Sequence, residues 1–163
     1  MSPQIESRRV SDLIPYERNA RTHSASQVSQ LAASIREFGW TNPLLIDGKN
    51  NIIAGHGRMQ AALKLGIDEV PVLVIDHLDD AQRKALGLAD NKLALNAAWD
   101  EQMLALEVSE LQVSDFDMKL IGFSNAEIAD LSAEVQFMPA DEGDQTRLDE
   151  KPLKMCPACG HEF

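Results

Sequence analysis

The chain has 163 residues, of which 44% are hydrophobic and 5% aromatic, and it carries a net charge of −11 at pH 7. This length suits one cored domain with a small appendage. No apolar run is long enough to span a membrane, so we expect no membrane partner. The first residues lack the pattern of a signal peptide, and we therefore expect a cytoplasmic protein.

The charge is unevenly distributed along the chain. Residues 1–66 hold eight lysines and arginines against five acidic residues, whereas residues 67–163 hold seven against twenty-one. The acidic second part would repel phosphates, so a broad DNA-wrapping surface is not expected there. The first part has the charge that an anion site needs.

The predicted elements alternate between strands and helices over the first 96 residues. In chain order they are a strand at 5–10, a helix from Ser24 or Ser26 to Phe38, hairpin strands at 43–46 and 52–53, a helix at 57–65, a strand at 70–75 and a helix from Asp79 or Asp80 to about Asn96. Serine and aspartate are favoured helix caps, and Gly39 and Gly66 end two of the helices. Two shorter helices follow, at 100–111 and 125–135.

This order predicts an α+β fold, with a small mixed sheet and helices, over residues 1–96. An acidic helical extension follows at 97–136. Residues 137–154 are acidic and poor in large apolar side chains, which is typical of a flexible linker. Residues 155–163 form a tail that holds both cysteines of the chain.

The most informative motif is a short apolar strand that turns through Gly55-His56-Gly57-Arg58 into a helix. The start of a helix leaves backbone N–H groups unpaired, and the helix dipole adds positive potential there. The two glycines let an anion approach the backbone, and Arg58 adds a fork of donors that matches phosphate oxygens. A tight turn with a surface arginine is the alternative interpretation.

Polar clusters flank this turn in the sequence. They are Glu17, Asn19 and Arg21 before the first helix, and Asp90 and Asn91 inside a later helix, where both are poor helix formers. His56 could stabilise charge or relay a proton beside a phosphate, or it could only form a hydrogen bond within the turn. Glu17 or Asp90 could act as a general base in phosphoryl transfer.

Taken together, these motifs resemble the N-terminal domain of the ParB/sulfiredoxin superfamily. They are most similar to the ParB-like domain of phages and mobile elements, which sometimes precedes a DNA methyltransferase in one polypeptide. The resemblance covers about residues 5–96. Its signature residues are Asn19-Ala20-Arg21, Asn42-Pro43, Gly55-His56-Gly57-Arg58, Val70-Pro71 and Asp90-Asn91. It implies a domain that binds a nucleoside triphosphate, CTP or ATP, together with Mg²⁺.

The resemblance also implies roles for individual residues. Gly55, His56, Gly57 and Arg58 match a phosphate motif, Asn19 and Arg21 match a box that approaches the phosphates, and Asp90 and Asn91 match a pair that holds Mg²⁺ and phosphate. Oxygen ligands such as Asp90 suit Mg²⁺. Partition proteins usually carry a second arginine where Gly57 stands. The turn lacks the reactive cysteine of sulfiredoxin, which argues against sulfinic-acid reduction.

The tail resembles one knuckle of a zinc ribbon, because Cys156 and Cys159 stand in a Cys-x-x-Cys-Gly turn and His161 follows. Zinc normally takes four ligands. A second copy of the chain in a homodimer, another protein, or His161 with water could complete the site. A tail that binds no metal tightly is the alternative.

From these residues and the resemblance we expect a ParB-like, Mg²⁺-dependent CTP- or ATP-binding module in phage- or plasmid-type DNA metabolism, with DNA or a DNA-modifying protein as partner. An NTPase, phosphotransferase or nuclease of the same fold is one alternative. A non-catalytic adaptor for a partner such as a methyltransferase is another. Residues 41–67 supply only one carboxylate, Asp47, which counts against a metal-dependent nuclease.

Overall fold

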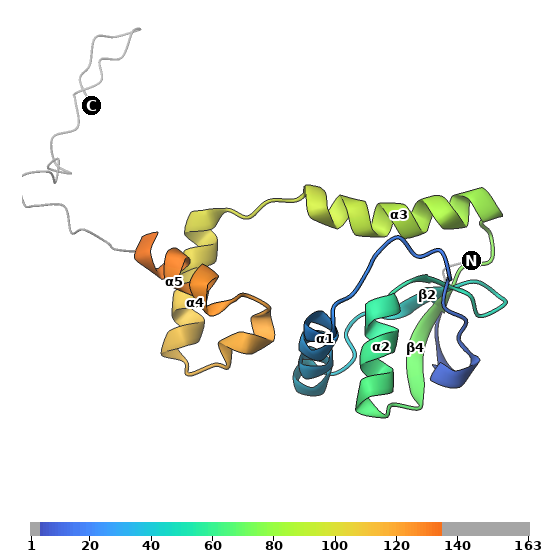
Figure 1. Ribbon diagram of the computed structural model, residues 1–163, viewed down its shortest axis with the longest axis horizontal. Helices are drawn as coiled ribbons and strands as arrows, with labels where there is room; N and C mark the ends of the chain where they lie inside the picture. The colour runs from blue at the N-terminus through green and yellow to red at the C-terminus, as the bar shows by residue number, and fades with distance from the viewer. Residues whose placement is uncertain (1–3, 135–163) are drawn as a thin grey trace, which may run out of the picture.

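Four short strands form a mixed sheet in the order β1-β4-β2-β3 in the computed structural model, which describes residues 4–134 (Figure 1). The strands are β1 (Ile5–Arg9), β2 (Leu44–Ile46), β3 (Ile52–Ala54) and β4 (Glu69–Val74). β4 runs antiparallel to β1 and parallel to β2, and β2 runs antiparallel to β3. The outer strands of the sheet are therefore β1 and β3.

The core lies on one face of the two central strands. Leu44 and Ile46 of β2 and Val70 and Val72 of β4 are fully buried, and each pair is spaced by two residues, so that both side chains point to the same face. Burial of each such side chain contributes roughly 1.5–3 kcal/mol. Met59 and Ala62, from the helix at residues 56–65, belong to the same buried hydrophobic cluster as these four side chains.

Two helices pack side by side, and their ends have clear causes in the sequence. α1 (Ala25–Phe38) begins where the Ser24 side chain accepts a hydrogen bond from Gln27 N–H, and it ends at Gly39. α2 (His56–Leu65) begins after Gly55 and ends at Gly66, both of which have a positive φ.

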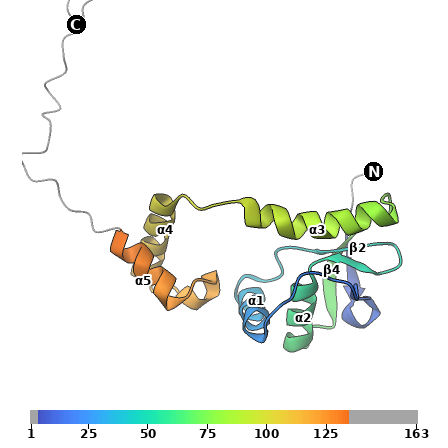
Figure 2. The same cartoon turned by 45° about the horizontal axis from the view of Figure 1, so that its top comes forward.

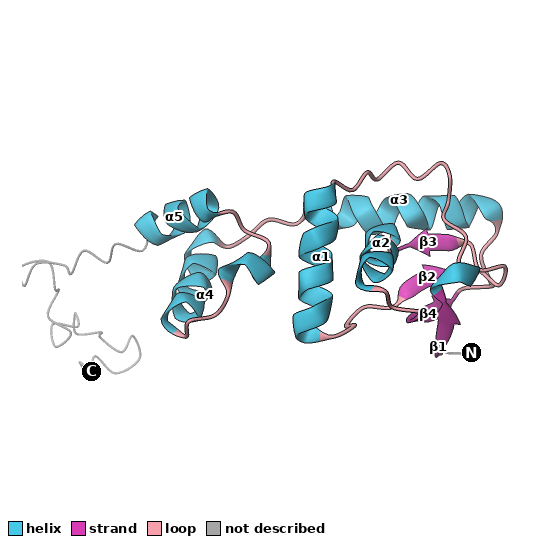
Figure 3. Ribbon diagram, turned by 60° about the horizontal axis from the view of Figure 1, so that its bottom comes forward, coloured by secondary structure: helices cyan, strands magenta, loops and turns pink. Residues whose placement is uncertain are grey.

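α3 (Asp80–Asn96) lies along the β3 edge of the sheet, on the opposite side from β1 (Figure 3). Its first turn is stabilised by a capping box between Asp79 and Gln82. At Gly87 an added Cβ would lie 3.0 Å from the carbonyl oxygen of Ile53, so the helix backbone comes very close to the strand. None of the 17 residues of α3 is fully buried.

Two further helices lie beyond α1, away from the sheet (Figures 1 and 2). α4 (Glu101–Val113) and α5 (Asn125–Glu134) bury Ala105, Val108 and Ile128. The 3₁₀ turn η2 (Met118–Ile121) contacts α1. Near it the rings of Phe38 and Phe116 stack with centroids 6.1 Å apart.

The structure confirms the expected α+β fold with a small mixed sheet. α2 begins one residue earlier than predicted, and the 3₁₀ turns η1 (Val10–Asp12) and η2 were not predicted. No helix among residues 4–134 has the length and apolar character needed to cross a bilayer. The predicted linker at 137–154 and the Cys156, Cys159 and His161 knuckle lie outside the described residues.

Candidate functional site

A groove of about 870 Å³ opens between α3, β3 and the connection from β1 to α1. We call residues 14–21 of that connection the strap. In Figure 1 the blue connection rises to α3 before it descends into α1. The predicted site residues that line the groove are Glu17, Asn19, Arg21, His56 and Asn91. Gly55, Gly57, Arg58 and Asp90 are not part of the lining.

The groove is lined by more positive than negative side chains. The cations are Arg18, Arg21, Arg83, Lys84 and Lys92, and the carboxylates are Glu17, Asp47 and Asp80. This local excess of positive charge stands out on a protein with a net charge of −11. It would attract an anion, and several arginines can donate forked hydrogen bonds to phosphate oxygens.

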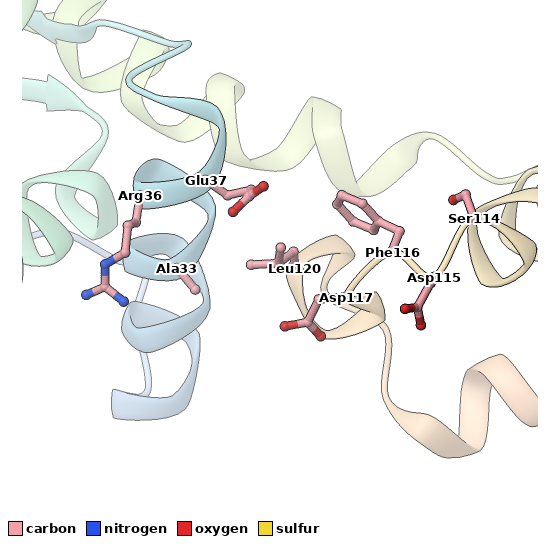
Figure 4. Close-up of a pocket in the computed structure, with 8 residues that line it drawn as sticks. All are labelled: Ala33, Arg36, Glu37, Ser114, Asp115, Phe116, Asp117 and Leu120. Carbon is pink, nitrogen blue, oxygen red and sulfur yellow. The ribbon is translucent and has the colours of Figure 1, made fainter.

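A second pocket, of about 490 Å³, lies between α1 and residues 114–120 (Figure 4). Three of its lining residues are acidic, Glu37, Asp115 and Asp117, and Arg36 is the only cation. Such a lining repels phosphate. Of the two pockets, the groove beside α3 is therefore the one suited to an anionic ligand.

The strap is attached at its beginning by backbone pairing with the hairpin. Ile14 N–H donates to Asn50 O, and Ile52 N–H donates to Ile14 O, each at 2.9 Å. Further along, Arg21 N–H donates to the Asn19 side-chain oxygen at 3.2 Å, and Asn19 Nδ2 donates to Arg21 O at 2.9 Å. Asn19 thus shapes the turn from which Arg21 projects.

His56 holds the strap from the first residue of α2. Its Nε2 atom accepts a hydrogen bond from Tyr16 N–H at 3.1 Å. Burial lowers the pKa of His56 below its ordinary value of 6.5, and the neighbouring His23 lowers this pKa further. The imidazole is therefore neutral at pH 7, with its proton on Nδ1.

Arg58 connects α2 with its surroundings. Its Nη1 donates to Asn42 O at 2.9 Å. Burial lowers the pKa of the Arg58 guanidinium, whereas the charge of Asp90 raises it, so the side chain lies within electrostatic reach of α3. Arg58 and Asp90, which are 32 positions apart in the sequence, are thus brought near each other, although neither lines the groove.

The two glycines of the turn are required by their neighbours. Gly55 has φ 101°, and an added Cβ would lie 2.5 Å from Leu44 Cδ2. At Gly57 an added Cβ would lie 2.9 Å from His23 Cε1. The His23 imidazole therefore occupies the space that a side chain at position 57 would need.

Sequence reasoning gave no site role to Asp47 and Arg83, which meet at one end of the groove. Asp47 is 5% exposed and accepts hydrogen bonds from Lys49 N–H, Asn51 N–H and the Asn51 side chain at 2.9–3.1 Å. Arg83 Nε lies 3.9 Å from Asp47 Oδ2. The position of an aspartate before Gly48 could have indicated this side-chain-bonded turn.

The carboxylates of the described residues do not gather into a metal cluster. No group of three or more His, Cys, Asp or Glu side chains that could hold a metal is found among residues 4–134. Asn91 Nδ2 donates to Gly87 O at 2.9 Å, which leaves its side-chain oxygen as a ligand atom at the groove. A Mg²⁺ ion at the groove would therefore take most of its ligands from phosphate and water.

Comparison with known families gives two matches along the chain. The ParB N-terminal domain matches residues 2–92, and the ParB-methyltransferase HTH domain matches residues 102–158. The second match spans most of the predicted acidic extension and linker. It agrees with the expected resemblance to ParB-like proteins that precede a DNA methyltransferase, whereas an HTH domain in this part of the chain was not predicted. The domain boundaries stay a prediction.

Individual relatives agree with the first match. The ParB-like nuclease domain-containing protein YnaK of Escherichia coli K12 is 56% identical over 81 residues, which are 50% of this chain and 93% of that protein. The probable chromosome 2-partitioning protein ParB of Deinococcus radiodurans is 40% identical over 74 residues, 44% of this chain but only 25% of that protein.

A similar solved structure is that of C-terminally truncated chromosome-partitioning protein ParB from Caulobacter crescentus complexed with CTP-γ-S. It is 25% identical, has a TM-score of 0.65, and the match covers 78% of this chain and 76% of that one. The family match covers residues 2–92, which is more than half of the chain. It agrees with the fold and with the order of the motifs. The chain therefore belongs to the ParB N-terminal domain family.

Proposed function

We propose that the groove between the strap and α3 binds a nucleoside triphosphate with Mg²⁺, and that CTP is the nucleotide. The observation that carries the proposal is the positive lining of this groove on an otherwise acidic chain. The similar ParB structure complexed with CTP-γ-S supports the choice of CTP over ATP. We further propose that the module acts in phage- or plasmid-type DNA metabolism.

In this proposal each group of residues has a distinct role. Arg21 and the first N–H groups of α2 hold the phosphates, and Arg58 supports that end of α2 through its bond to Asn42 O. Asn91 on the groove wall, and Asp90 once its side chain turns from Arg58 towards the groove, would provide oxygen ligands for Mg²⁺, which would neutralise the phosphate charge when bound. Glu17 is the carboxylate placed to act as a base if the nucleotide is hydrolysed.

A non-catalytic adaptor is the second candidate function. The match of residues 102–158 to the ParB-methyltransferase HTH domain favours it. Residues 97–134 hold nine acidic residues and one lysine, so this part is better suited to a protein partner than to DNA phosphates. A nuclease is less compatible with the groove, because no carboxylate cluster is found in the described part of the chain.

Isothermal titration with CTP, ATP and GTP, each with and without Mg²⁺, tests the proposal. We expect selective, Mg²⁺-dependent binding of CTP, and loss of the Mg²⁺ dependence in Asp90→Ala. Glu101→Ala, an exposed acidic residue in α4, serves as the matched control. Failure of all three nucleotides to bind would reject the nucleotide site and leave the adaptor as the better account.

A further inference from the structure

The strap depends on few bonds for its position over the groove. Its first residue, Ile14, is paired with the hairpin through the backbone. Beyond Ile14, one hydrogen bond among the described residues ties the strap to another element, and it runs from Tyr16 N–H to His56 Nε2. The bonds that Asn19 makes with Tyr16 and Arg21 are local to the strap. A single acceptor atom thus anchors this segment beyond its first residue.

We propose that His56 is a positioning residue, whose unprotonated Nε2 atom holds the strap, and with it Asn19 and Arg21, over the groove. The part of this inference that concerns ligand affinity rests on the proposed nucleotide site. Nε2 can accept the Tyr16 N–H only while it carries no proton. Protonation turns the acceptor into a donor, so that two N–H groups face each other and the strap is released at Tyr16.

The surroundings of His56 determine when this happens. His23 lies against Gly57 next to it, Glu17 and Arg21 line the groove from the strap, and Lys92 lines it from α3. Burial opposes a positive charge on His56, and His23 opposes it further. The bond to Tyr16 is therefore intact at neutral pH and is lost only as the pH falls through the lowered pKa of His56, which lies below 6.5.

Hydrogen exchange of the full chain without nucleotide tests the positioning role directly. At pH 7.5 His56→Ala should speed the exchange of the Tyr16 amide about tenfold, which corresponds to the loss of one hydrogen bond. The wild type should show this change only as the pH is titrated downwards below 6.5, after correction for intrinsic exchange. In His56→Gln the side-chain oxygen accepts the same N–H and does not titrate, so protection should persist throughout the titration.

Two controls keep the experiment decisive. His77→Gln alters an exposed histidine far along the chain and should behave as wild type. Protection of the β4 amides shows that each variant is folded at each pH. The comparison of His56→Gln with wild type over the acid titration stands even if His56→Ala does not fold. A Tyr16 amide whose protection is unchanged by pH in the wild type would overturn the proposal.

A second arm measures CTP affinity by titration at pH 7.5. We expect binding about tenfold weaker in His56→Ala than in His56→Gln. If the exchange results hold but the wild type binds no triphosphate, the proposed function fails and the positioning role stands. If the wild type binds CTP and the strap of His56→Ala stays protected, the positioning role fails and the proposed function stands.

Discussion

Arg58 stabilises the junction between the loop before β2 and the first turn of α2. Its guanidinium binds Asn42 O and lies beside Gly55, while the charge of Asp90 acts on it from α3. We expect Arg58→Ala to abolish triphosphate binding, because the start of α2, at the proposed phosphate end of the site, loses the support of the Arg58 bond to Asn42 O. The free energy of unfolding should fall by only about 1 kcal/mol, the usual contribution of one hydrogen bond.

Isothermal titration and urea denaturation measure the two effects of Arg58→Ala. Arg9→Ala, an exposed arginine on β1, is the matched control and should leave the affinity for CTP unchanged. Wild-type affinity in Arg58→Ala would show that the phosphates lie elsewhere in the groove.

Asp47 stabilises the β2–β3 hairpin in its ionised form. Burial raises its pKa, but the hydrogen bonds from Asn51 and Lys49 and the charge of Arg83 outweigh burial, so the pKa lies below the ordinary 3.8. The stabilisation is therefore complete above pH 3.8 and is lost as the pH falls through the folded-state value. We expect Asp47→Asn to lower the free energy of unfolding by roughly 1–2 kcal/mol at pH 7.

Urea denaturation between pH 3 and pH 7 checks this prediction. The wild type should lose stability more steeply than Asp47→Asn at the acidic end, because only the wild type has this carboxylate to protonate. Parallel curves for the two proteins would mean that Asp47 contributes nothing as a charge. Asp12→Asn, an exposed aspartate, controls for a general effect of charge.

At the scale of single elements, α3 is the least firmly packed of the three helices that surround the sheet. None of its residues is fully buried, so its first turn depends strongly on the capping box of Asp79 and Gln82. Asp79→Ala should cost about 1 kcal/mol of local stability and speed amide exchange in residues 80–83.

Hydrogen exchange with mass spectrometry resolves this effect by segment. Asp100→Ala removes the equivalent cap of α4, where the side chain accepts from Met103 N–H, and should affect α4 instead of α3. If exchange in α3 is the same in Asp79→Ala and the wild type, the helix is held by contacts with β3 rather than by its cap.

The sequence predicted the elements well where the signals are local. Ser24, Gly39 and the apolar spacing between them define α1, and the Asp47–Asn51 turn between two apolar runs defines the hairpin. Membership of the ParB family was likewise identified from the order of the motifs and is confirmed.

The arrangement of the candidate site was less predictable, because it depends on contacts between distant residues. Tyr16 and His56 are 40 positions apart, and nothing local shows that an imidazole accepts a strap amide. Arg58 matched a phosphate motif, yet its side chain binds Asn42 O and does not line the groove. The close approach of α3 to β3 depends on a glycine, Gly87, that has no other recognisable signal.

At the scale of the whole molecule, the chain segment 97–100 joins the sheet domain to the extension formed by α4 and α5. The extension also packs on the sheet domain, through the contact of η2 and Phe116 with α1. Stacking of the Phe38 and Phe116 rings is worth about 0.5–1.5 kcal/mol. Phe116→Ala should therefore release the extension without unfolding either part.

Small-angle scattering should detect the release of the extension as a larger radius of gyration, while thermal unfolding of the sheet domain stays unchanged. Phe123→Ala is the matched control, because it removes an aromatic pair with Trp99, ring centroids 6.0 Å apart, and leaves the Phe38–Phe116 stack in place. An unchanged radius in Phe116→Ala would show that other contacts of η2 are sufficient.

The position of α3 also protects the protein from aggregation. Of the two outer strands, β1 carries Glu6, Arg8 and Arg9, charges that discourage the addition of a foreign strand. β3 reads Ile52-Ile53-Ala54 and carries no charge. Beyond the pairing of Ile52 with Ile14, its edge depends on α3 as a cover (Figure 3). A chain whose α3 detaches would present an uncharged apolar strand to its neighbours. A ligand that keeps α3 in place would thereby also keep the protein from polymerising through that edge.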